Sequence, residues 1–212
     1  MSRTLVFQGD SITDAGRHRD KPTHLGLGYV SIIAAHLMTQ RPEIELTYWN
    51  RGASGDRTID LLSDWQVRCL DLQPELFSLY IGVNNTWRRY DNNDPTTADV
   101  FAKELRHLLD STFTQSSVSP ENSILIEPFV LDQPAGTKGH WREEDLDAKA
   151  AIVASLAKEY GTGFLPLQSI FDQALNQAPA VFWAEDGVHP TPAGHSLIAQ
   201  EWLKVMEPAL SE

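Results

Sequence analysis

A serine near one end of the chain and an aspartate–histidine pair near the other are the residues best suited to chemistry. Ser11 follows a short apolar run and Gly9, a pattern typical of a strand that ends in a turn. A serine hydroxyl attacks an ester only when an imidazole takes its proton and a carboxylate orients that imidazole. Asp186 and His189 stand three residues apart in a loop bounded by glycine and proline, and they can supply both groups. We therefore interpret Ser11, His189 and Asp186 as candidate nucleophile, base and orienting acid.

Four short blocks of the sequence resemble those of the SGNH hydrolases, also called GDSL-type esterases, and they occur in the order of that family. They are residues 9–11, Gly52 within 50–55, residues 82–85, and residues 186–189. The longer strings 9–14, 81–87 and 186–190 are similar to the branch that contains acetylxylan esterases and small carbohydrate acetylesterases. The resemblance extends over residues 5–202.

The resemblance implies a catalytic triad of Ser11, Asp186 and His189. It also implies an oxyanion hole made by the backbone N–H groups of Ser11 and Gly52 and the side-chain amide of Asn84. No metal ion and no organic cofactor is required. At position 85 the family usually has aspartate and this chain has Asn85. The catalytic set survives that change, and the open question is how the loop is hydrogen-bonded.

Each block also has a structural interpretation. A Gly-Asp-Ser string is often only a turn, and an aspartate three residues before a histidine often stabilises a loop. Gly52 and the Asn84–Asn85 pair can likewise belong to ordinary turns. Asp10 and Asp14 we expect to be structural. Four blocks in family order favour the functional interpretation.

The composition is that of a soluble globular enzyme. The chain has 212 residues, of which 42% are hydrophobic and 22% charged, and we expect residues 1–212 to form one domain. A formal net charge of -12 disfavours nucleic acid and anionic membranes as partners. Cys69 is the only cysteine, which excludes an internal disulfide. The N-terminal apolar run is too short for a signal peptide and no stretch is long enough to span a membrane, so we expect a cytoplasmic protein.

The order of elements predicts alternating strands and helices. Apolar runs predict strands over residues 5–7, 44–49, 76–81, 124–126 and 164–167. Helical spacing predicts helices over residues 29–38, 56–72, 98–113, 143–160 and 170–175, and a last helix that begins after Thr191 and ends near 205. Polar segments over residues 13–24 and 86–95 predict loops, and so does the segment over 129–141, which contains Pro134, Gly136 and Gly139. This pattern indicates a three-layer α/β/α sandwich with a parallel sheet of about five strands, the flavodoxin-like fold of the SGNH hydrolases.

Aromatic residues near the blocks are candidates for contact with substrate. Trp87, Tyr90, Trp141 and Trp183 fall in predicted loops, where flat rings can stack on sugars or close a small acyl pocket. Trp183, just before Asp186, is the best candidate for a pocket wall. Packing in the core, or a subunit contact, is an equally good explanation for any one of them.

The leading functional hypothesis is a serine esterase that removes O-acetyl groups from carbohydrate esters such as acetylated xylo-oligosaccharides. Within the same fold the alternatives are a thioesterase or lysophospholipase, and a different class is a catalytically weak protein that binds glycans. The expected partner is a small acetylated carbohydrate. The resemblance to the acetylxylan esterase branch also favours a homo-oligomer.

Overall fold

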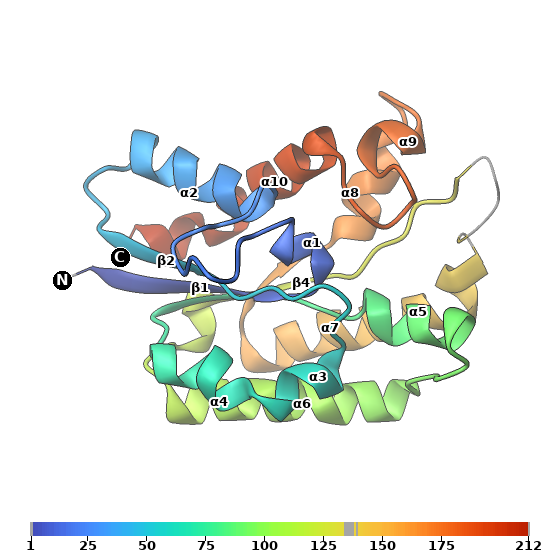
Figure 1. Ribbon diagram of the computed structural model, residues 1–212, viewed down its shortest axis with the longest axis horizontal. Helices are drawn as coiled ribbons and strands as arrows, with labels where there is room; N and C mark the ends of the chain where they lie inside the picture. Colours follow the sequence, from blue (N-terminus) through green and yellow to red (C-terminus); the bar gives the residue numbers. More distant parts are fainter. Residues whose placement is uncertain (1, 134–137, 139, 212) are drawn as a thin grey trace.

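Five parallel strands form the sheet on which the rest of the chain is built (Figure 1). The computed structural model describes residues 2–133, 138 and 140–211. The strands are β1 (Arg3–Gly9), β2 (Leu46–Asn50), β3 (Leu76–Tyr80), β4 (Ser123–Ile126) and β5 (Gly163–Leu165), in the spatial order β2-β1-β3-β4-β5. Every neighbouring pair is parallel. This is the flavodoxin-like order, and it confirms the predicted fold class.

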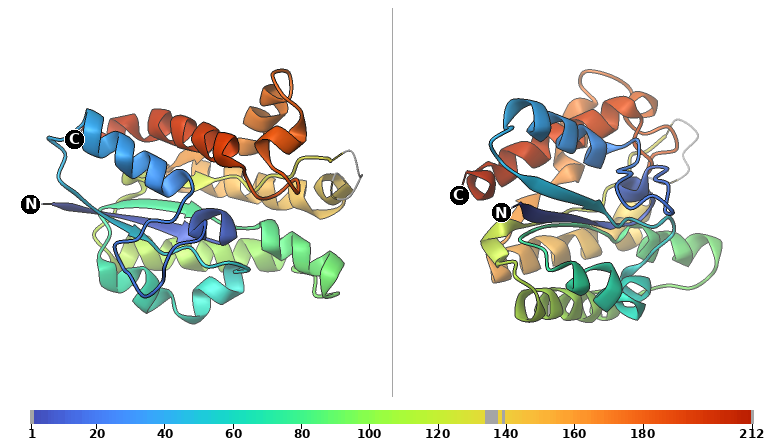
Figure 2. Two further views of the ribbon diagram at one scale, coloured as in Figure 1. Left: turned by 45° about the horizontal axis from the view of Figure 1, so that its top comes forward. Right: turned by 60° about the vertical axis from the view of Figure 1, so that its left-hand side comes forward.

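Helices cover both faces of the sheet and make the outer two layers (Figures 1 and 2). One face carries α2 (Tyr29–Gln40), α8 (Leu167–Ala174) and α10 (Pro192–Leu210). The other carries α3 (Thr58–Ser63), α4 (Trp65–Arg68), α6 (Ala98–Gln115) and α7 (Asp147–Tyr160). The predicted sandwich is therefore present with helices on both sides.

The strand sequences explain why two cores form. In β1 the side chains of Leu5 and Phe7 join the core under α2 and α10, and Val6 between them joins the core under α3 and α6. Because successive strand residues point to opposite faces, a strand with helices on both sides reads as an uninterrupted apolar run. β3 is likewise buried on both faces, and all five of its residues are buried, including the polar Ser78.

The segment over residues 56–72 differs from the single helix expected there. It consists of α3, α4 and a 3₁₀ turn, η1 (Leu70–Leu72). Asp64 between the two helices has φ -139° and ψ 24°, outside the helical region, so the helix is interrupted there, although the buried residues Thr58, Leu61, Trp65 and Arg68 keep helical spacing. Within α3, Ile59 is 45% exposed and Leu61 is fully buried.

A second difference concerns residues 86–95, which were expected to form a loop. Helix α5 (Val83–Asp91) occupies most of that segment. Gly82, with φ 135°, turns the chain after β3, and the helix begins at the next residue. Further short elements are α1 (Ser11–Asp14), α9 (Ala180–Trp183), the 3₁₀ turn η2 (Pro120–Asn122) and a π-helical turn, η3 (Arg142–Leu146), which precedes α7.

The expected loop over residues 129–141 is described only in part, because residues 134–137 and 139 lie outside the described residues. Its first half is attached to the sheet edge that carries the site, since Leu131 N–H donates to the Gly187 carbonyl at 2.8 Å. Among the described residues, no helix combines the length and apolar character needed to cross a membrane.

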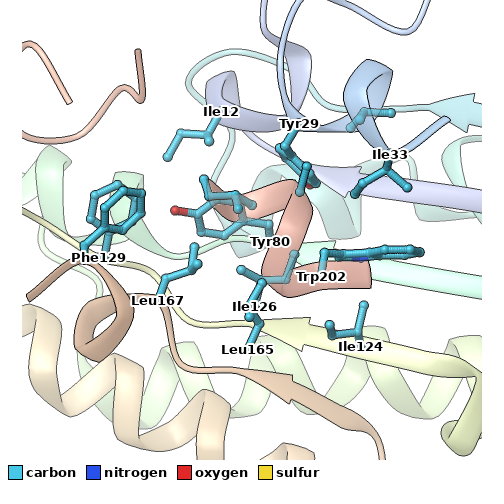
Figure 3. Packing of buried hydrophobic residues seen from close by; sticks show 14 of the residues in the cluster. Ile12, Tyr29, Ile33, Tyr80, Ile124, Ile126, Phe129, Leu165, Leu167 and Trp202 are labelled. Atoms are coloured by element: carbon cyan, nitrogen blue, oxygen red, sulfur yellow. The ribbon is translucent and has the colours of Figure 1, made fainter. Parts of the chain in front are cut away.

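Trp202 of α10 joins the upper helices to the centre of the sheet (Figure 3). Its side chain is fully buried, its ring packs on Phe7 with centroids 5.4 Å apart, and its indole N–H donates to Ser78 Oγ at 3.1 Å. One residue therefore contacts both β1 and β3, the two strands whose ends carry catalytic candidates.

We expect Trp202→Ala to lower the free energy of unfolding by about 3–5 kcal/mol, because it leaves a cavity and an unpaired hydroxyl in the core. Urea denaturation followed by circular dichroism measures the change. Leu27→Ala is the matched control, since Leu27 is 79% exposed and its truncation should change stability by less than about 0.5 kcal/mol. A loss below about 1 kcal/mol for Trp202→Ala would contradict this account.

Candidate active site

The nucleophile candidate stands at the first residue of a helical turn at the end of β1. A Cβ on Gly9 would lie 2.4 Å from the Tyr80 carbonyl oxygen, so only glycine allows β1 to turn this close to β3. The Asp10 carboxylate then caps α1, its Oδ1 accepting from Ile12 N–H at 3.0 Å. Ser11 is thereby held at the carboxyl edge of the sheet. The capping bond gives Asp10 the structural role expected for it.

The structure brings the three predicted catalytic residues together. Ser11 Oγ lies 2.9 Å from His189 Nε2, and His189 Nδ1 lies 2.9 Å from Asp186 Oδ2. Because the Asp186 carboxylate accepts only, Nδ1 carries the hydrogen and donates it. Nε2 is then free to accept the proton of Ser11. This is the arrangement of a serine hydrolase triad.

The loop that carries Asp186 and His189 is tied to itself and to its neighbour. Asp186 Oδ1 accepts from Val188 N–H at 2.9 Å and from His189 N–H at 2.7 Å. Gly187 has φ 85°, and a Cβ there would lie 2.4 Å from the Leu131 carbonyl oxygen. The carboxylate is thus fixed by its own loop before it meets the imidazole.

Asp186 and His189 each favour the charged form of the other. Burial alone would raise the pKa of Asp186, but hydrogen bonds from the His189 ring and from two backbone N–H groups outweigh it and hold that pKa well below its usual range. The hydrogen bond that the His189 ring donates to Asp186 in turn raises the pKa of His189, against the opposing effect of burial. The carboxylate therefore stays ionised at neutral pH and stabilises the imidazolium that forms when Ser11 gives up its proton.

Lys138 is a charged neighbour of the triad that sequence reasoning missed. Its Nζ donates to the Asp186 carbonyl oxygen at 2.7 Å and to Oδ2 at 3.1 Å. The same ammonium lies 4.4 Å from the centroid of the Trp87 ring, a cation–π distance. Its positive charge opposes protonation of His189 and offsets a small part of the rise in the pKa of that ring. Nothing in the sequence marks Lys138, because 48 residues separate it from Asp186 and only the fold joins them.

The structure contradicts the expectation that Gly52 N–H donates to the oxyanion. Gly52 N–H already donates to Asn50 Oδ1 at 3.0 Å and is buried. A Cβ at this position would lie 2.4 Å from the Asp14 nitrogen. Glycine is needed here because the chain passes directly against α1, and the amide is not available to an oxyanion.

Asn84 follows β3, as expected, and its hydrogen-bond partner lies next to a second glycine that could donate to the oxyanion. Asn84 follows β3 at the start of α5, and its Nδ2 donates to the Asp56 carbonyl at 3.1 Å. The other hydrogen of that amide remains available. Gly55, adjacent to Asp56, is exposed with φ 88°, and its N–H has no hydrogen-bond partner among the described residues. The string over 50–55 contains both glycines, and sequence alone does not tell which amide is free.

Asn85 has a definite structural role. Its Oδ1 accepts from Thr58 N–H at 3.3 Å, and its Nδ2 donates to Thr58 Oγ1 at 2.9 Å and to Thr96 Oγ1 at 3.3 Å. The side chain is fully buried, and its amide joins the start of α3 to α5. The Asn85 amide thus matches two hydroxyl groups that accept hydrogen bonds from it.

Three of the aromatic candidates gather near the triad, although in helical segments rather than in loops. Trp87 of α5 has its ring centroid 5.7 Å from that of His189 and 5.3 Å from that of Trp141. Tyr90 stacks on Trp141 with centroids 5.0 Å apart. Trp87 therefore lies beside the base, and Tyr90 is separated from it by the other two rings.

The structure contradicts the expectation that Trp183 forms a wall of the pocket. It is the last residue of α9 and only 9% exposed, and its indole N–H donates to the Ala174 and Ala178 carbonyls at 3.1 and 3.2 Å. The open cavity of about 540 Å³ beside His189 is lined instead by Glu185, Asp186, His189, Pro190, Thr191 and Pro192. Proximity in sequence to Asp186 did not place Trp183 in the site, because α9 turns its ring towards α8.

Comparison with known proteins agrees with this geometry. The sequence model of the GDSL-like lipase/acylhydrolase family matches residues 7–197. The chain belongs to this family. Among GDSL-like relatives, the acetylxylan esterase of Geobacillus stearothermophilus is 30% identical over 204 residues, which are 94% of this chain and 92% of that protein.

Solved structures of GDSL-like proteins show the same fold. A putative GDSL-like lipase from Parabacteroides merdae superposes with a TM-score of 0.92 at 33% identity, covering 97% of this chain and 96% of the other. The crystal structure of the Geobacillus stearothermophilus acetylxylan esterase gives a TM-score of 0.86 at 30% identity, with 96% and 94% covered. The family and the relative together make this chain a carboxylic ester hydrolase.

We expect Lys138→Met to raise the pKa of His189, because the substitution removes a positive charge that opposes protonation of the ring. The neutral ring is the base in free enzyme, so the acidic limb of the kcat/KM profile for p-nitrophenyl acetate should move to higher pH. Lys103→Met, at an exposed lysine of α6, is the control and should leave the limb in place. A limb that moves to lower pH would contradict the assignment.

Proposed function

We propose that the protein is a serine esterase that removes O-acetyl groups from carbohydrate esters such as acetylated xylo-oligosaccharides, through an acyl-enzyme intermediate. The observation that carries the proposal is the continuous hydrogen-bonded line from Ser11 through His189 to Asp186. The similarity to an acetylxylan esterase over nearly the whole chain supports the choice of substrate class.

In the first half of the reaction, His189 Nε2 accepts the proton of Ser11 while Oγ bonds to the acyl carbon. The carbonyl oxygen becomes an oxyanion, and the donors proposed for it are the N–H groups of Ser11 and Gly55 and the Asn84 amide. When the tetrahedral intermediate collapses, the bond to the sugar oxygen breaks and that oxygen takes the proton from His189. The acetyl group stays on Ser11 as an ester.

The second half repeats these steps with water. His189 takes a proton from a water molecule, the resulting hydroxide attacks the acetyl carbon, and Ser11 Oγ leaves with the proton. Acetate is released and the free enzyme is restored. All the groups that these steps use come from the chain itself.

Trp87 is the aromatic residue best placed to contact substrate. Its ring lies against His189 and Lys138, so the wall of the site next to the base is flat and rigid. We propose that this wall limits the acyl group to short chains or supports one sugar face. Tyr90 acts at a greater distance, through its stacking on Trp141.

Hydrolysis of p-nitrophenyl esters from acetate to octanoate, beside acetylated xylo-oligosaccharide, tests the reaction and its chain-length preference. We expect turnover of acetate and of the sugar ester, a steep fall with acyl length, and loss of activity in Ser11→Ala by a factor of about 10³ or more. Preference for octanoate would favour the lysophospholipase or thioesterase alternative. Absence of turnover with every ester would favour a glycan-binding protein.

Asn84→Ala should lower kcat by about 10²- to 10³-fold, because the oxyanion loses one donor while the triad stays in place. The change should appear in kcat more than in KM, since the donor acts on charge that exists only in the transition state. Asn176→Ala, at an exposed asparagine after α8, is the control for amide removal. A KM effect with kcat unchanged would assign Asn84 to substrate binding instead.

A further inference from the structure

A cavity lined by arginines lies against the loop that carries Gly55. Its volume is about 470 Å³, and the guanidinium groups around it belong to Arg17, Arg19, Arg51 and Arg68. The remaining lining residues are Ala53, Asp56, Asp60, Ser63 and Asp64. Four arginines around one cavity are unexpected in a chain whose formal net charge is -12.

The acidic residues near this cavity are occupied by particular partners. Arg68 pairs with Asp56 at 2.6 Å and with Asp64 at 3.3 Å. Asp60 pairs with Arg57, which lies outside the cavity lining, at 3.2 Å. Arg19 pairs with Asp14 at 2.9 Å.

Arg17 and Arg51 are left without a carboxylate partner among the described residues. Arg17 Nε donates to the Gly52 carbonyl oxygen at 2.8 Å, which leaves the two terminal nitrogens of its fork. Arg51 Nε is buried and has no hydrogen-bond partner within the described part of the chain. Burial lowers the pKa of both guanidinium groups, and the nearby charge of Arg68 lowers that of Arg51 further. Neither guanidinium thus has an ion-paired carboxylate among the described residues, although the charges of Asp14 and Asp64 act on Arg17 and Arg51 without ion-pair contact.

The cavity adjoins the proposed site of acyl transfer. Arg17 follows α1, which begins at Ser11, and Arg51 stands four residues before Gly55. Asp56 both lines the cavity and accepts the Asn84 amide hydrogen. In Figure 1 the loop between β2 and α3 passes close to α1, and a Cβ on Gly52 of this loop would lie 2.4 Å from the Asp14 nitrogen.

A planar, bidentate anion fits such a pair of free guanidinium forks better than a neutral hydroxyl does. A volume of about 470 Å³ lies in the range of small-molecule sites and accommodates a sugar ring. We propose that this cavity is a subsite for the carboxylate of an acidic sugar residue on the acetylated substrate, bound by Arg51 and Arg17. The proposal rests on the proposed function, because it names the substrate class of that same site.

The test compares two acetylated xylo-oligosaccharides of equal length, one neutral and one bearing a glucuronic acid side group. The readout is the ratio of kcat/KM for the acidic substrate to that for the neutral one, so a general loss of activity cancels. We expect a ratio above one in the wild type, falling about tenfold in Arg51→Gln and falling also with added salt. Arg51→Lys keeps the positive charge but lacks the guanidinium fork, so its ratio should lie between those of the wild type and Arg51→Gln.

Arg106→Gln, at an arginine of α6 that pairs with Glu159 of α7, is the matched control and should leave the ratio at its wild-type value. A wild-type ratio of one, or a ratio unchanged in Arg51→Gln, overturns the subsite. A different result is expected if the proposed function is wrong but the subsite exists. The Ser11→Ala protein would then still bind the acidic oligosaccharide more tightly than the neutral one by calorimetry, although the wild type hydrolyses neither.

Calorimetry with inorganic phosphate and with free glucuronate separates the possible sources of the anion. Binding of glucuronate that Arg51→Gln abolishes, with weaker binding of phosphate, supports an acidic sugar as the ligand. Phosphate that binds through Arg51 while the acidic oligosaccharide has no advantage overturns the proposal in favour of a free anion.

Discussion

The hydrogen bond between Ser11 Oγ and His189 Nε2 joins residues 178 positions apart, and most of the architecture is needed to bring them together. Ser11 is placed by β1, which lies between β2 and β3 in the sheet. His189 is placed by the loop before α10, and α10 is held down by Trp202 against β1 and β3. Because every strand is parallel, their carboxyl ends meet at one edge, and the two loops reach it from opposite ends of the sequence.

The loop over residues 50–56 shows how firmly the rest of the site is built. Asn50 Nδ2 donates to the Thr13 and Leu25 carbonyls, both at 2.7 Å, and Ala53 N–H donates to the Gly9 carbonyl at 2.9 Å. Arg17 and Arg68 hold the carbonyls of Gly52 and Arg51 from the other side. A loop fixed from both sides keeps its donors aimed without any rearrangement during reaction, which is the condition for effective stabilisation of developing charge.

The sequence predicted the fold class, the order of strands and helices, and the positions of Ser11, Asn84, Asp186 and His189, because each follows a strand end or a turn that local residues specify. Prediction failed where the outcome depends on contacts that only the folded chain determines, whether they are local or long-range. Whether Gly52 or Gly55 has a free N–H depends on which of the two donates to Asn50 Oδ1, and that one is Gly52. Trp183 was misplaced because its neighbours in α8, not its neighbours in sequence, determine where its ring points. Lys138 was missed since its contact with Asp186 exists only in the folded chain.

The two ends of the described chain meet at the sheet edge opposite the catalytic residues. Arg3, the first residue of β1, donates from a terminal nitrogen to the Ala209 carbonyl near the end of α10 at 3.1 Å, and Figure 2 shows both ends on that side. A short peptide can therefore bridge them without crossing the site. The fold is thus suited to circular permutation, with new ends opened in an exposed connection and the triad carried intact on a differently ordered chain.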